Sequence, residues 1–113
     1  MLADGHRNAA ENIEATIGLL SASPRAARLI IEGAWGAAFH WIAFGCEMKH
    51  SKHQESHARL GTFLRTLGET RTADAWEQLD RIHQGGWYGS EPDATKVANA
   101  LALLGDIHTW ATT

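Results

Sequence analysis

The chain has 113 residues, 44% of them hydrophobic, and a formal net charge of −3 with the histidines neutral. This length suits one domain over residues 1–113 with a single core, and the negative charge excludes a broad basic surface for DNA. Valine occurs once and proline twice, so the composition disfavours a β-sheet and predicts an all-α fold.

Little in the chain points to a place outside the cytoplasm. The single cysteine, Cys46, cannot form an internal disulfide, which fits a reducing compartment. The first residues contain no apolar signal core, and the longest apolar run, residues 33–46, is too short to span a bilayer. We therefore expect a cytoplasmic protein without a membrane partner. The apolar surroundings of Cys46 should raise the pKa of its thiol and leave it inert.

Apolar residues at helical spacing predict a first helix over residues 6–20. Ser23 can cap the next helix and Pro24 suits its first position, which predicts a second helix over residues 24–49.

The second helix is apolar on two faces, which is typical of a central helix covered by neighbours or by a second subunit. Because four short neighbours would not easily cover both faces, we expect a homodimer. Glycine is unfavourable inside a helix, so another helix or chain should come close at the three glycines of this segment: Gly33, Gly36 and Gly45.

The segment Ser51-Lys-His-Gln54 has the spacing of a capping box and predicts that a third helix opens there and stops at Gly68. On such a helix His53 and His57 would share one face, and His50 could reach the same point from the preceding turn. A zinc site needs a further ligand pair that this pattern lacks. We therefore expect no metal, and these histidines remain weak metal candidates.

A fourth helix is predicted over residues 72–84, where Gly85-Gly86 supply the positive-φ residues that stop helices. Asp93 can cap a fifth helix that ends near Trp110. All connections are short, so neighbouring helices should run antiparallel in an up-and-down bundle of four to five helices.

The end of the fourth helix is the richest stretch in chemistry. Within nine residues it holds a cation, an imidazole, an indole and a phenol: Arg81, His83, Trp87 and Tyr88. Such groups at a helix end can bind a ligand or a partner; alternatively, the two aromatic residues close the core and Arg81 pairs with Glu77 or Asp80. Arg81 and His83 are two residues apart, so on a helix they point to different sides.

Three segments together resemble the HEPN family over about residues 25–110. They are Ala37-Ala-Phe-His-Trp41, Ser56-His57, and Arg81 followed by Trp87-Tyr88. The resemblance implies a bundle of four or five helices that commonly dimerises and acts on RNA or nucleotides. Many HEPN proteins are ribonuclease toxins or partners of small nucleotidyltransferases that neutralise them.

The catalytic signature of that family is an arginine followed, after four to six residues, by a histidine. Arg81 matches the arginine, but Gly86, Trp87 and Tyr88 stand where the histidine should follow. Tyr88 resembles the variant of non-toxin relatives, and a phenol with a reference pKa of about 10 is a poor acid or base near neutral pH. The resemblance therefore implies binding or assembly rather than ribonuclease activity.

These observations predict a non-catalytic HEPN-like protein that dimerises and binds a nucleotide, RNA or a partner protein, without a cofactor. It could be one half of a toxin–antitoxin-like system with a small nucleotidyltransferase. Arg81 would supply charge, Trp87 and Tyr88 an aromatic wall, and His40 and His57 would complete a polar cleft.

Two alternatives stay open. The first is a metal-independent HEPN endoribonuclease that uses Arg81 with a displaced histidine, His83. The second is a helical metal-binding protein that uses His50, His53 and His57.

Overall fold

The computed structural model describes residues 1–20, 23–88 and 93–113, and within these ranges the side chains of Pro24 and residues 86–88 are not described. The described chain is an all-α bundle without strands, as predicted. Its elements are α1 (Ala3–Ile17), α2 (Pro24–His50), the 3-10 turn η1 (His57–Arg59), α3 (Leu60–Thr66), α4 (Thr70–Tyr88) and α5 (Ala94–Thr112).

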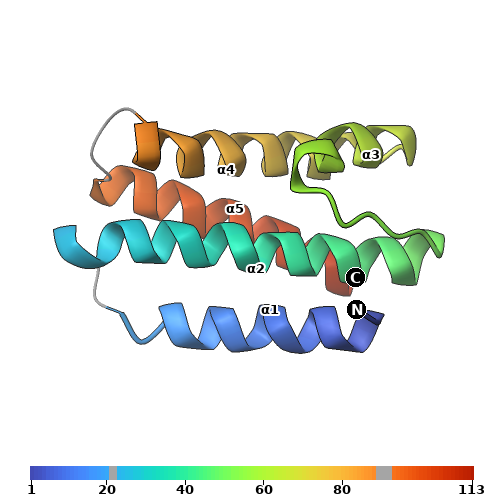
Figure 1. Ribbon diagram of the computed structural model, residues 1–113, viewed down its shortest axis with the longest axis horizontal. Helices are drawn as coiled ribbons and strands as arrows, with labels where there is room; N and C mark the ends of the chain where they lie inside the picture. Colours follow the sequence, from blue (N-terminus) through green and yellow to red (C-terminus); the bar gives the residue numbers. More distant parts are fainter. Residues whose placement is uncertain (21–22, 89–92) are drawn as a thin grey trace.

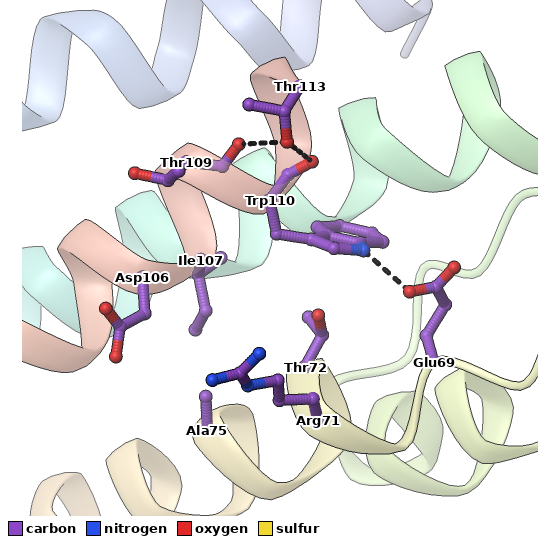
Figure 2. A pocket seen from close by; sticks show the side chains of 9 residues that line it. All are labelled: Glu69, Arg71, Thr72, Ala75, Asp106, Ile107, Thr109, Trp110 and Thr113. Atoms are coloured by element: carbon purple, nitrogen blue, oxygen red, sulfur yellow. Dashed lines mark hydrogen bonds between the residues drawn. The ribbon is translucent and has the colours of Figure 1, made fainter.

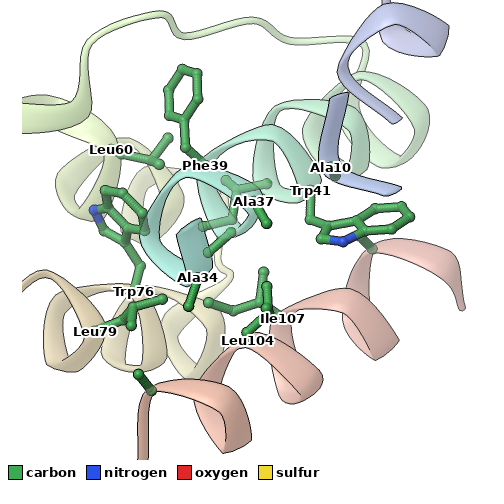
Figure 3. Close-up of a cluster of buried hydrophobic side chains, with 14 of the residues drawn as sticks. Ala10, Ala34, Ala37, Phe39, Trp41, Leu60, Trp76, Leu79, Leu104 and Ile107 are labelled. Atoms are coloured by element: carbon green, nitrogen blue, oxygen red, sulfur yellow. The ribbon is translucent and has the colours of Figure 1, made fainter. Parts of the chain in front are cut away.

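Helix α2 is the centre of the bundle (Figure 1). It packs against α1 on one side and against α5 and α4 on the other, while the short α3 lies beside α4. Trp41 and Ile42 of α2 are almost wholly buried, as are Trp76 of α4 and Ile107 of α5, and Figure 3 shows these layers meeting around α2. Most of α2 is thus covered within one chain, so the two apolar faces of this helix are no argument for a second subunit, and the homodimer stays a prediction.

The glycines of α2 allow close packing at two of the three expected places. A Cβ at Gly33 would overlap the side chain of Ile17 on α1, and one at Gly45 would overlap the indole of Trp110 on α5. At Gly36 a Cβ would lie 3.8 Å from the Cδ1 atom of Ile13, an ordinary contact.

A network of polar contacts links three helices across the core. The Glu14 carboxylate on α1 accepts a hydrogen bond from the Trp41 indole on α2 and lies 3.0 Å from Nδ1 of His108 on α5. The His108 ring stacks on Trp41 with 4.1 Å between ring centroids. The carboxylate thus gives the buried indole N–H a hydrogen-bond acceptor. Without an acceptor, a buried N–H destabilises the folded state.

Two of the predicted helix-start signals were confirmed, those of Ser23 and Asp93. Ser23 Oγ accepts a hydrogen bond from the Ala26 N–H at 3.2 Å, and Asp93 Oδ1 accepts one from the Lys96 N–H at 2.8 Å. Helix α1 begins three residues earlier than predicted, at Ala3, and ends at Ile17.

The predicted start of the third helix at Ser51 was wrong: the helix, α3, begins at Leu60, after the η1 turn. Ser51 adopts a left-handed conformation, with φ 55° and ψ 37°, and caps the end of α2. Its N–H donates to the carbonyl of Glu47 at 3.0 Å, and the Lys52 N–H donates to that of Cys46 at 3.4 Å. These hydrogen bonds satisfy carbonyl groups in the last turn of α2. The segment after Ser51 therefore ends α2 rather than starting a new helix, and no helical turn forms before His57.

The predicted stop at Gly85-Gly86 was also wrong, because α4 continues through both glycines to Tyr88. Each glycine weakens a helix by only about 1 kcal/mol, and a run that is already helical can absorb this. By contrast, Gly68 has φ 81° and lies between α3 and α4, where a stop was predicted.

Among the described residues, one helix is long and apolar enough to span a membrane. Within Arg25–His50 the most apolar 18-residue window has a mean hydropathy of 1.3, but 67% of that window is buried within the bundle. That burial is the arrangement of a core helix.

Candidate binding cleft between α2 and α4

A cavity of about 560 Å³ opens between α2, η1 and the second half of α4. Two carboxylates and two imidazoles surround one indole in it. The lining residues are Glu32, Trp35, His57, Ala58, Asp80, His83 and Gln84. We call this cavity the α2–α4 cleft.

Trp35 forms the floor of the cleft. The His83 ring lies parallel to it, with 4.1 Å between centroids and 6° between planes, and the His57 ring lies 4.5 Å away at 46°. Trp76 stacks against Trp35 from the core at 5.8 Å. The Trp35 indole N–H donates to Oδ1 of Asp80 at 2.9 Å, which fixes the plane of the ring.

The two carboxylates hold the ring system in place. His83 Nε2 lies 2.7 Å from Oε2 of Glu32; because an ionised carboxylate only accepts, Nε2 carries the proton in this contact. Asp80 also accepts the Gln84 amide at 3.0 Å through its second oxygen. The His83 side chain is 14% exposed and that of Glu32 43%, so the carboxylate faces the opening more than the imidazole does.

Of the predicted site residues, His57 and His83 meet in this cleft, on the ring of Trp35. His40 does not line it: its Nδ1 lies 2.9 Å from Nδ1 of His6 on α1. The ring of Phe39 lies between the two regions, 5.3 Å from His40 and 4.2 Å from His57.

Arg81 lies outside the cleft and is exposed. It pairs with neither expected carboxylate, since Glu77 binds Arg65 and Asp80 binds the Trp35 indole. Because α4 continues through Gly85 and Gly86, it also separates Arg81 from residue 88, which was predicted to share its site. In a helix, residue 88 lies about 10 Å further along the axis. The predicted roles of the Trp87 and Tyr88 side chains lie outside the described residues.

The three histidines of the metal alternative do not converge. His50 Nε2 contacts Glu69 at 3.1 Å, His53 lies between Glu47 and Glu55, and His57 joins the cleft. The expected shared face was wrong because residues 51–56 are not helical. Among the described residues no group of three or more His, Cys, Asp or Glu side chains could hold a metal ion.

Cys46 behaves as predicted. It is 1% exposed, and burial, aided by the nearby carboxylates of Glu69 and Glu47, raises the pKa of its thiol to about 12. A thiol in this state is not a nucleophile near neutral pH.

The central indole of the cleft and its two carboxylates were not predicted as site residues from the sequence: Trp35, Glu32 and Asp80. One signal was present. Glu32 is the only Asp, Glu, Lys or Arg residue between Arg28 and Glu47, in a mostly apolar helix, and a carboxylate in such a place needs a polar partner. No sequence pattern announced that Trp35 would meet Asp80, which is 45 residues away.

Comparison with known proteins identifies no relative: no family model, no curated protein and no solved structure matches this chain.

Proposed function

We propose that this protein is a non-catalytic, HEPN-like helical protein that dimerises and binds a partner protein by taking up a cationic side chain in the α2–α4 cleft. The observation that carries the proposal is the pair of carboxylates, Glu32 and Asp80, beside the Trp35 ring system. Among the described residues, those that line the cleft include neither Lys nor Arg.

Charge and geometry favour a cation over a nucleotide. Two carboxylates repel a phosphate, whereas they attract a guanidinium or ammonium group. The lone pairs of Asp80 that are not used by Trp35 and Gln84 can accept further hydrogen bonds. A nucleobase would have to compete with His83, which already covers one face of Trp35.

The separation of Arg81 and His83 supports a role without catalysis. His83 lines the cleft and its Nε2 is engaged by Glu32, whereas Arg81 is exposed and does not line it. A ribonuclease of the usual HEPN kind needs an arginine and a histidine at one phosphate. The family resemblance makes a small nucleotidyltransferase the first partner to test.

Three exposed leucines support a dimer. Leu19, Leu29 and Leu101 are 86%, 58% and 41% exposed. Leu19 follows α1, Leu29 lies in the second turn of α2 and Leu101 lies in the first half of α5; α1 ends where α2 and α5 begin, at one end of the bundle (Figure 1). We propose that the dimer forms through this end, since exposed apolar patches mark protein–protein contacts.

The test is a titration of ¹⁵N-labelled protein with N-acetyl-L-argininamide, followed through the Trp35 indole N–H signal, which Trp35→Phe identifies. We expect that signal to move with a dissociation constant in the millimolar range, equivalent to about −4 kcal/mol. Glu32→Gln and Asp80→Asn should each weaken binding, while Asp4→Asn, an exposed carboxylate on α1, serves as the matched control.

AMP and a short single-stranded RNA are the competing probes. If either moves the Trp35 signal at lower concentration than the arginine derivative does, the cleft is a nucleotide site and the proposal is wrong. Equal binding by Glu32→Gln, Asp80→Asn and the natural protein would also overturn it.

A further inference from the structure

A second cavity, of about 450 Å³, lies between the first turns of α4 and the last turns of α5. It shares no lining residue with the α2–α4 cleft. Its size falls within the range of small-ligand sites in proteins. Figure 2 shows its charged and aromatic side chains arranged around one open space.

Two opposite charges stand on opposite walls of this cavity. Arg71 comes from α4 and Asp106 from α5, and Figure 2 shows the Arg71 guanidinium extended along the space between the two helices. Within the part of the chain that the structure describes, neither side chain takes part in an ion pair or a hydrogen bond. Each side chain is therefore available to form an ion pair with a ligand.

The other carboxylate of the cavity, Glu69, is already engaged. It accepts the Trp110 indole N–H at 2.7 Å and lies 3.1 Å from Nε2 of His50. Burial by itself raises the pKa of Glu69, but the hydrogen bonds from His50 and Trp110 outweigh it and hold the pKa below its usual range. Glu69 thus stays ionised and positions the Trp110 ring as a wall.

The rest of the cavity wall is partly apolar. Ile107 is 1% exposed, and Ala75 faces it from α4. The Thr72 hydroxyl, from a residue that is 6% exposed, points into the same space in Figure 2. The cavity therefore offers a cation, an anion, a hydroxyl and a short apolar surface.

We propose that this cavity binds a small zwitterion, namely a free α-amino acid with an aliphatic side chain. Arg71 and the Thr72 hydroxyl bind its carboxylate, Asp106 binds its ammonium group, and Ile107 with Ala75 contacts its side chain. A guanidinium takes a carboxylate through two parallel hydrogen bonds, and one charge of each sign selects against ligands with only one.

The first part of the test uses three matched probes on the natural protein: L-leucine, N-acetyl-L-leucine and L-leucinamide. The acetyl derivative lacks the ammonium group and the amide lacks the carboxylate. The readout is the indole N–H signal of Trp110. We expect L-leucine to bind at least about tenfold more tightly than either derivative, a difference of about 1.4 kcal/mol.

The second part assigns each charge to its residue. Arg71→Gln should abolish the advantage of L-leucine over L-leucinamide, and Asp106→Asn should abolish its advantage over N-acetyl-L-leucine. Arg25→Gln, an exposed arginine at the start of α2, is the control and should change neither. Both altered residues are exposed, so unchanged melting temperatures should accompany the loss.

Equal affinity for the three probes, or no shift of the Trp110 signal by L-leucine at concentrations up to about 50 mM, would overturn the proposal. Because the two cavities share no residue, failure here leaves the argument for the α2–α4 cleft intact. The probe series on the natural protein remains decisive even if a variant fails to fold.

Discussion

Acid should destabilise this fold through a pair of histidines that face each other across α1 and α2. Nδ1 of His6 lies 2.9 Å from Nδ1 of His40, so one ring donates a hydrogen bond to the other. The His6 residue is 3% exposed, and its Nε2 is buried and makes no hydrogen bond within the described part of the chain. Protonation of His6 places an N–H on both ring nitrogens, beside a second imidazole and without an acceptor at Nε2.

The surroundings of the pair mostly lower the pKa values of the two imidazoles. Burial lowers the pKa of His6, and the neighbouring rings of His40 and His53 and the N-terminal ammonium lower it further, while Glu55 raises it. Burial also lowers the pKa of His40, followed by the influence of His57. Both rings are therefore neutral in the folded protein at a pH where the unfolded chain already binds protons.

The sign of the effect follows from this difference. A histidine in the unfolded chain titrates near pH 6.5. Between that pH and the lowered folded-state pKa the unfolded state holds more protons, so stability is complete above pH 6.5 and falls as the pH decreases through this window. Each imidazole contributes a slope of at most about 1.4 kcal/mol per pH unit, and the two together at most about 2.7. Such a slope is large beside a total stability of about 5–15 kcal/mol.

The assay is urea denaturation at a series of pH values from 7.5 to about 5, together with NMR titration of the imidazole signals. His40→Asn keeps a hydrogen-bond donor toward His6 but removes one titrating ring, so the slope should fall to about half. A free energy of unfolding that stays level across this window, or His6 and His40 signals that titrate at or above pH 6.5, would refute the reasoning.

Three further predictions follow from packing, exposure and the site. Gly45→Ala should lower the free energy of unfolding by about 1–3 kcal/mol, because its Cβ would overlap an indole of α5; Gly105→Ala, with open space around it, should raise it by about 0.5–1 kcal/mol in thermal or urea melts. Light scattering at micromolar concentration should report a dimer that Leu29→Glu weakens, and a monomer of the natural protein would rule the dimer out. The purified protein should not cleave single-stranded RNA; cleavage that disappears in both Arg81→Ala and His83→Gln would instead establish the ribonuclease alternative.

Signals that act within one helical turn could be read from the sequence. Ser23 and Asp93 cap their helices as predicted, because the hydrogen bond of each cap joins residues only three positions apart. The apolar spacing of α2 likewise announced a central helix, since burial on two faces leaves a two-faced pattern. The inert state of Cys46 followed from the same apolar surroundings.

Sequence signals whose meaning depends on the neighbouring helix led to wrong predictions. The capping-box spacing at Ser51 is the same whether it opens a new helix or ends the old one, and the unpaired carbonyls of α2 decided for the end. The glycine pair at 85–86 permits a stop but does not impose one, because its cost of about 1 kcal/mol per residue is small beside the packing of a long helix.

The set of residues that line the candidate site depends on the tertiary structure. His57 and His83 were recognised as notable residues, but the ring that joins them, Trp35, is one of many apolar residues of the second helix and was not singled out. Its partners come from η1 and α4, and the hydrogen bond to Asp80 spans 45 positions of the chain. A local pattern records which face of a helix is apolar, whereas the packing of α2 against α4 determines which polar groups meet at its edge.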